Sequence, residues 1–137
     1  MVSHQHDGPP APARLLGVVP LAVDLGTVAG QRIMLLGVEA WDGWADLRFA
    51  RIDVGADRPL PRRVPPRAAW RVAADGHRLE IVDAVGRGDR SFSNSEVRVR
   101  PVPPDWARLD VEVEVVPGQP PLAGSVALPP WLQPHRR

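Results

Sequence analysis

The sequence predicts an all-β domain built from two packed antiparallel sheets. Runs of alternating apolar and polar residues recur along the chain, tight-turn signals separate them, and no stretch keeps a helical repeat over about ten residues. Strands are expected at residues 17–24, 31–41, 44–54, 68–74, 77–84, 96–102, 107–116 and 124–128. About seven or eight short strands with proline-rich crossings favour a sandwich, with an open β-barrel as the alternative.

The chain is expected to hold a single folded domain over residues 14–128. Residues 1–13 offer too little apolar surface to offset the entropy of ordering them, so they are predicted to form a flexible tail. The short apolar run Leu15–Val23 resembles the hydrophobic region of a signal peptide, but Asp7 precedes it, Pro20 interrupts it, and Asp24 ends it without a small-residue cleavage site. A cytoplasmic location is therefore slightly favoured.

A hairpin is predicted around Asp42–Gly43, which stands between Trp41 and Trp44. A two-residue turn needs positive φ at its centre, and Asp-Gly adopts such a backbone at little cost. The same dipeptide recurs at Asp75–Gly76, between two further strand-like runs. We expect the two tryptophans to pair across the strands of the first hairpin, one buried and one partly exposed.

The strand after Trp44 changes its apolar parity between Phe49 and Ile52. A regular strand cannot bury both sets of residues on one face, because successive side chains point to opposite faces. A β-bulge near Ala50–Arg51 is therefore predicted.

The clearest alternation lies in Leu109–Val115, with valines and Leu109 on one face and acidic residues on the other. The preceding strand-like segment, Glu96–Arg100, carries arginines on its polar face. We expect these two strands to pair, which would set the arginines against Glu112 and Glu114. Exposed cross-strand ion pairs of this kind contribute about 0.2–1 kcal/mol each and mainly select the register.

Two segments are predicted to lie outside the sheets. Residues 58–67 contain too many prolines for a central strand and are expected to form an extended surface loop, and residues 129–137 are expected to form a tail. The loop holds the densest basic cluster of the chain: Arg58, Arg62, Arg63 and Arg67. Guanidinium groups suit phosphate or carboxylate, so this cluster is a candidate for binding an anionic partner, with a solvated loop as the alternative.

The composition excludes several classes of protein. All 17 basic residues are arginine, and lysine and tyrosine are absent, which is typical of GC-rich codons such as those of actinobacteria. Acidic residues offset the arginines to a formal charge of +1, so nucleic-acid binding is not expected. With no cysteine there can be no disulfide or thiolate site, and no apolar run is long enough to span a membrane as a helix.

The order of these features carries a resemblance to a known group. The features follow one another as Val38–Trp41, the Asp42–Gly43 turn, Leu47–Phe49, a proline-rich gap, Trp70–Val72, the Asp75–Gly76 turn, Pro103–Pro104 and Ala107–Leu109. It resembles small immunoglobulin-like β-sandwich domains of actinobacterial proteins over about residues 17–128. The resemblance implies an immunoglobulin-like architecture and supplies no catalytic residues.

Candidate residues for catalysis are few. His77 is the histidine outside the two predicted tails, and it directly follows the second Asp-Gly turn, where exposure is expected. A serine nucleophile needs a base that is itself oriented by a third group. Ser91, Ser93 and Ser95 are instead expected to form turns in a polar loop. We therefore predict that the protein is not an enzyme.

Candidate ligand sites have simpler explanations as well. His4, His6 and Asp7 offer at most three metal ligands on a flexible tail, and Asp42 and Asp46 lack the further oxygens that calcium requires, so no metal site or cofactor is predicted. The tripeptide Arg87–Asp89 matches an integrin-binding motif, but short motifs recur by chance in an arginine-rich chain.

Function is expected to depend on binding. The first hypothesis is a non-enzymatic protein-interaction or structural module that contacts a protein partner or self-associates through its strands. The second is a carbohydrate-binding domain that uses exposed tryptophans, with Trp41 and Trp44 as the candidates and Trp70 assigned to the core. Trp106 and Trp131 complete the set of five.

Overall fold

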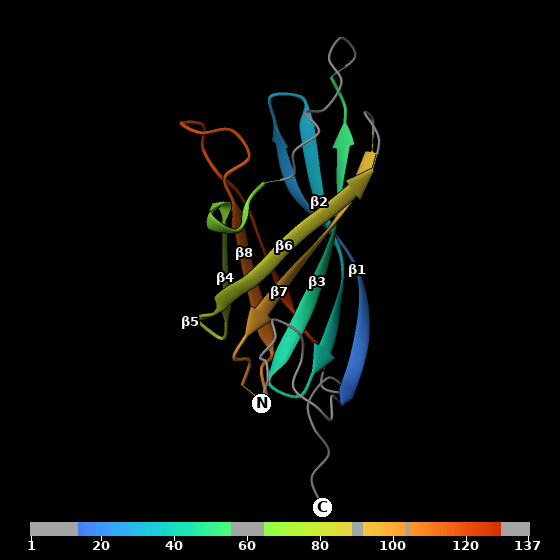
Figure 1. Ribbon diagram of the computed structural model, residues 1–137, viewed down its shortest axis with the longest axis vertical. Coiled ribbons are helices and arrows are strands. Elements are labelled where there is room, and N and C mark those ends of the chain that lie inside the picture. Colours follow the sequence, from blue (N-terminus) through green and yellow to red (C-terminus); the bar gives the residue numbers. More distant parts are fainter. Residues whose placement is uncertain (1–13, 56–64, 89–91, 104, 130–137) are drawn as a thin grey trace, which may run out of the picture.

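The structure, a computed structural model, describes residues 14–55, 65–88, 92–103 and 105–129. In this part of the chain, nine antiparallel strands form two sheets that pack face to face (Figure 1). The elements are β1 (Leu15–Val28), β2 (Gln31–Trp41), β3 (Trp44–Asp53), the short 3-10 turn η1 (Arg67–Ala69), β4 (Trp70–Ala74), β5 (His77–Arg78), β6 (Glu80–Gly88), β7 (Phe92–Arg100), β8 (Arg108–Val113) and β9 (Leu122–Ala127). The predicted all-β sandwich is confirmed.

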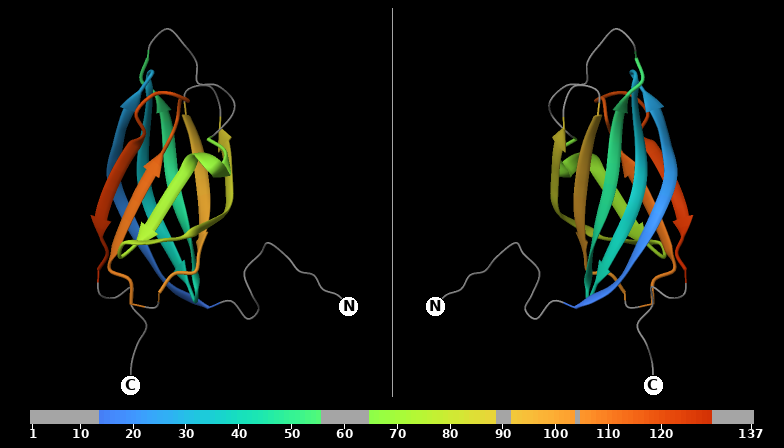
Figure 2. Two further views of the ribbon diagram at one scale, coloured as in Figure 1. Left: turned by 90° about the vertical axis from the view of Figure 1, so that its left-hand side faces the viewer. Right: turned by 90° about the vertical axis from the view of Figure 1, so that its right-hand side faces the viewer.

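The five-stranded sheet, sheet A, has the order β1-β2-β3-β7-β6, and the four-stranded sheet, sheet B, has the order β5-β4-β8-β9. The two views of Figure 2 look onto opposite sides of the sandwich, with β4, β8 and β9 nearer the viewer on the left and β1, β2 and β3 nearer on the right. The first three strands are consecutive neighbours, so they form a meander before the chain crosses to sheet B.

The core lies between the two sheets and follows from strand alternation. Leu47 and Phe49 of β3 point inward from sheet A, and Val72 and Leu109 point inward from sheet B, all of them at most 1% exposed. Trp70 packs against Phe49, with ring centroids 4.6 Å apart, and its indole Nε1 donates to the carbonyl of Pro65 at 3.2 Å. The prediction that Trp70 belongs to the core is confirmed.

The predicted bulge near Ala50–Arg51 is wrong. β3 pairs with β7 without a break from Ala45 to Ile52, so its alternation is never interrupted. The irregularity lies across the sheet, in β2, where the register shifts at Leu36. The alternation of β3 stays regular because Arg51 faces inward, as Leu47 and Phe49 do. Its side chain is buried, and its Nε donates to the hydroxyl of Ser93 at 3.2 Å.

The predicted pairing of Glu96–Arg100 with Leu109–Val115 is also wrong. β7 lies between β3 and β6 in sheet A, whereas β8 lies between β4 and β9 in sheet B. The acidic side chain of Glu112 faces Arg71 of β4, at 3.9 Å. Complementary charges could not identify the partner strand, since several strands of this chain carry them.

One predicted strand, residues 77–84, divides between the two sheets. β5 pairs with β4 in sheet B, and β6 pairs with β7 in sheet A, so the chain changes layers at Leu79. Leu79 is buried, and its backbone N–H donates to the carbonyl of Val72 at 2.8 Å. This crossing joins the two sheets at one side of the sandwich.

The opposite side of the sandwich is closed by β1 of sheet A and β9 of sheet B. Gly124 of β9 lies so close to Leu25 of β1 that a Cβ at this glycine would stand 2.5 Å from the Leu25 Cδ2. A Cβ there would require the Leu25 side chain to shift. The absence of a side chain at Gly124 therefore allows the two edge strands to approach each other.

Candidate functional site

The paired tryptophans lie at one end of sheet A, where Trp41 ends β2 and Trp44 begins β3. Their rings stack with centroids 5.1 Å apart and an interplanar angle of 1°. Trp44 is buried, at 5% exposure, whereas Trp41 is half-buried. The predicted cross-strand pair, with one buried and one partly exposed member, is confirmed.

Both faces of the Trp44 ring are occupied. Trp41 reaches it from β2, and the guanidinium carbon of Arg98 in β7 lies 4.3 Å from the centre of the ring. Because β3 lies between β2 and β7, these two neighbours cover opposite faces of the indole. A flat ligand would therefore find its stacking surface on Trp41 rather than on Trp44.

Arg98 is held over this ring by a two-point ion pair with Asp46. Its Nε donates to Oδ1 at 2.9 Å and its Nη2 donates to Oδ2 at 3.1 Å. The hydrogen bonds to Asp46 raise the pKa of Arg98 above its ordinary value. Asp46 is 7% exposed, and both of its carboxylate oxygens accept hydrogen bonds from this arginine.

The other turn residue considered as a calcium ligand, Asp42, lies at the surface. Its Oδ2 pairs with Arg14 Nη2 at 3.4 Å, and both side chains are about two-thirds exposed. Among the described residues, no group of three or more histidine, aspartate or glutamate side chains stands close enough to hold a metal ion.

A second ion-pair cluster crosses the middle of the same outer face. Arg48 of β3 is hydrogen-bonded to Glu39 of β2, and its Nη1 lies 2.9 Å from Oε2 of Glu96 in β7. The hydrogen bond with Glu39 raises the pKa of Arg48. The two carboxylates hold the guanidinium from both sides, so it is positioned before any partner arrives.

Two exposed apolar side chains flank this cluster. Leu36, turned outward by the bulge in β2, is 38% exposed, and Val85 of β6 is 49% exposed. Between them lies an open groove of about 480 Å³, whose lining includes Arg48 and Glu96. Gly86, which has no side chain, and Asn94 also line it. We call this the sheet A groove.

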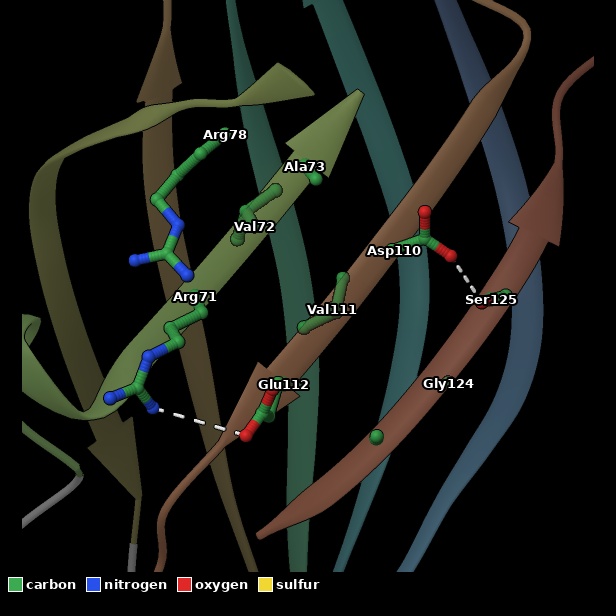
Figure 3. Close-up of a pocket in the computed structure, with 10 residues that line it drawn as sticks. Arg71, Val72, Ala73, Arg78, Asp110, Val111, Glu112, Gly124 and Ser125 are labelled. Atoms are coloured by element: carbon green, nitrogen blue, oxygen red, sulfur yellow. Dashed lines mark hydrogen bonds and ion pairs between the residues drawn. The ribbon is translucent and has the colours of Figure 1, made fainter. Parts of the chain in front are cut away.

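The outer face of sheet B differs in character (Figure 3). A smaller hollow of about 220 Å³ there is lined by Arg71 and Glu112 on one side and by the small residues Gly124 and Ser125 on the other. The hydroxyl of Ser125 bonds to Asp110, which also pairs with Arg108 at 3.4 Å. No large apolar side chain is exposed among the residues that line this hollow.

The predicted arginine cluster can be placed only at Arg67. This residue lies in η1 and is exposed, and its Nη1 donates to the carbonyl of Val82 in β6 at 3.1 Å. Arg58, Arg62 and Arg63 lie outside the described residues, so the cluster stays a prediction. The lining of the sheet A groove contains none of these four arginines.

Other candidates fall at scattered positions. His77 is exposed in β5, as predicted. The prediction of a loop around Ser91–Ser95 is wrong for Ser93 and Ser95, which lie buried in β7 and point into the sandwich. Ser91 lies outside the described residues, as do His4, His6, Asp7, Asp89, Trp131 and most of the two predicted tails, while Trp106 is buried in the core.

Sequence reasoning missed the residues of the sheet A groove. Leu36 ends the apolar run Ile33–Leu36, and only the bulge turns it outward. Arg48 and Glu96 are separated by 47 intervening residues, and their contact depends on the pairing of β3 with β7. Arg48 lies at an exposed position of β3, and nothing local in the sequence identifies its partners.

The fold and this surface define a class: an antiparallel β-sandwich with a charged and apolar groove on the outer face of one sheet. Comparisons with protein families, with curated proteins and with solved structures found no match. The described residues include no helix long and apolar enough to cross a membrane. The sheet A groove therefore has to be interpreted from its own chemistry.

Proposed function

We propose that this protein is a non-enzymatic protein-interaction module whose contact surface is the outer face of sheet A. The observation that carries the proposal is the sheet A groove, in which Leu36 and Val85 are exposed on either side of a positioned ion pair. Protein interfaces combine apolar contacts with polar and charged ones, and this groove offers both on one face.

The charges of the groove support recognition of a protein surface. Arg48 is already held by Glu39 and Glu96, so docking would cost little further side-chain entropy. A partner that covers Leu36 and Val85 removes apolar surface from water, and the charged groups between them restrict which partner fits. The immunoglobulin-like architecture suggested by the sequence is compatible with such a role, since sandwich domains of many cell-surface proteins act through their surfaces.

The test uses a photo-reactive amino acid, p-benzoylphenylalanine, placed at Val85 of the full chain in intact cells. We expect a discrete covalent adduct that disappears when Leu36→Asp is added. The matched control carries the same reactive residue at Val54, which is 50% exposed and lies outside the groove lining. The same adducts from both positions, or an adduct at Val85 that survives Leu36→Asp, would contradict the proposal.

A carbohydrate-binding role is a second candidate because half-buried Trp41 leaves part of a ring accessible. Its ligand would stack on the side of Trp41 that faces away from Trp44. Titration of a glycan panel should then change the tryptophan fluorescence of the wild-type protein and not that of Trp41→Ala. An unchanged wild-type spectrum across the panel would remove this candidate.

A further inference from the structure

We propose that the occupant of the sheet A groove is a second copy of this chain, packed sheet A against sheet A about a two-fold axis. This inference rests on the proposed function, because it names the partner of the same surface. The order of charges across the sheet supports a second copy as the partner.

The groove residues form one row across four neighbouring strands. From β2 through β3 and β7 to β6, the row contains Gly37, Arg48, Glu96 and Val85, and the bulged Leu36 stands beside Gly37 at its β2 end. The row is therefore apolar, positive, negative and apolar. Arg48 is the direct cross-strand partner of Glu96, and Glu96 is that of Val85, so these side chains share the outer face.

Such a row is complementary to itself. A two-fold axis parallel to the strands, running between β3 and β7, reverses the order of the row in the second copy. Each Arg48 then faces the partner's Glu96, and each Val85 faces the bulge of the partner's β2, where Leu36 stands beside Gly37. Apolar groups meet apolar groups at both ends, and opposite charges meet twice in the middle.

The neighbouring row adds a second match. Asp46 of β3 and Arg98 of β7 are direct cross-strand partners, so the same axis sets each Arg98 over the partner's Asp46. The ends of this row, Glu39 and Asp83, are both acidic. They lie farthest from the axis, and Arg48 compensates Glu39 within its own chain, so water and that arginine moderate their repulsion.

The area of the face is that of a small, transient interface. Four strands about 4.8 Å apart, paired over about eight residues, present roughly 500 Å². A standard interface buries about 800 Å² on each partner. The dimer is therefore expected to be reversible, with a dissociation constant in the micromolar range.

Sedimentation velocity of the full chain, from low micromolar to millimolar concentration, should show a monomer–dimer equilibrium. Arg48→Glu and Glu96→Arg should each weaken the dimer by about tenfold or more, since each variant places like charges opposite each other. An equimolar mixture of the two variants should restore dimerisation, because one copy is then acidic at both positions and the other is basic at both.

The mixture separates contacts between chains from contacts within one chain. Both variants lose the intrachain Arg48–Glu96 pair, and mixing cannot restore it, so recovery on mixing reports the interface alone. Arg71→Glu is the matched control, since it reverses a half-exposed arginine of an ion pair on the other sheet and should leave the dimer unchanged. Circular dichroism and thermal unfolding of each variant show that it is folded.

Three results would overturn the inference: a wild-type monomer at every concentration, a dimer indifferent to both variants, or no recovery on mixing. The photo-reactive residue at Val85 distinguishes this failure from that of the proposed function. An adduct that contains a different protein would rule out a second copy as the partner and would still support the sheet A groove as an interaction surface. If no adduct depends on Leu36, both the dimer and the proposed interaction surface are ruled out.

Discussion

The Asp42–Gly43 and Asp75–Gly76 turns share a dipeptide and a role but differ in backbone and in supporting contacts. At the first turn Gly43 has positive φ, +91°, and Asp42 does not, whereas at the second both residues do, with φ of 51° and 84°. The second turn therefore has the backbone of a type I′ hairpin, which matches the twist of the strands that it joins. One dipeptide supports two turn conformations.

The two aspartates also differ in their partners. The Asp75 carboxylate accepts hydrogen bonds from the backbone N–H groups of Ala107 and Arg108, at 3.0 and 2.9 Å, and so ties the turn to the start of β8. Asp42 makes an exposed ion pair with Arg14 instead. The first turn is flanked by the stacked tryptophans and bonds through its backbone to Arg14 and Val102, whereas the second is tied down by its own aspartate side chain. In both places Asp-Gly reverses the direction of the chain. The contacts that stabilise each turn are made with residues outside the dipeptide's own two positions and differ between the two turns.

The largest effect is expected at the first turn, from Trp44→Ala. Removing a ring that is 5% exposed and covered on both faces should lower the free energy of unfolding by about 3 kcal/mol. Urea denaturation followed by circular dichroism measures the loss. Trp44→Phe is the matched control, because it keeps an aromatic ring and removes an indole N–H that has no acceptor among the described residues. An equal loss for both variants would mean that the stacked ring is not what holds this turn.

The next largest effect is expected at the second turn, from Asp75→Ala. The variant leaves two backbone N–H groups without their acceptor and places alanine at positive φ, so we expect a loss of about 2 kcal/mol in the same assay. Asp75→Asn keeps an oxygen acceptor and tolerates this backbone, and it should lose about half as much. If Asp75→Asn lost as much as Asp75→Ala, the negative charge and not the hydrogen bonds would be the stabilising feature.

Gly43→Ala and Gly76→Ala should be alike in spite of the difference between the turns. Both glycines have positive φ, and a Cβ at either would meet no atom within 4 Å. The cost is conformational only, about 1 kcal/mol each, measured as a shift of the urea midpoint. A much larger loss at one of the two turns would show that its glycine contributes through packing as well.

The smallest effect is expected from Asp42→Ala. The ion pair with Arg14 is exposed on both sides and screened by water, so its loss should change the free energy of unfolding by less than about 0.5 kcal/mol. Thermal unfolding at low and high salt checks this, since whatever the pair contributes should vanish at high salt. A loss comparable to that of Asp75→Ala would abolish the contrast between the two aspartates.

Periodicity and turn chemistry predicted most of the fold because both are local. They located both Asp-Gly hairpins and the tryptophan pair, but they missed the Ala29–Gly30 turn, where a non-glycine residue adopts φ of 52°. The partners of β7 and β8 could not be predicted, since complementary charges occur on several strands and pairing depends on the whole topology. The same reason concealed the sheet A groove, whose Leu36 faces outward only because of a bulge.

The passage of the chain between layers at Leu79 bears on how the molecule opens. β5 and β6 belong to different sheets, yet a single buried residue separates them, so neither sheet can detach without pulling a strand from the other. Amide hydrogens of β4 and β7, one in each sheet, are therefore expected to exchange with solvent through the same global opening and with the same free energy. Two layers that would otherwise be separate folding units are made into one.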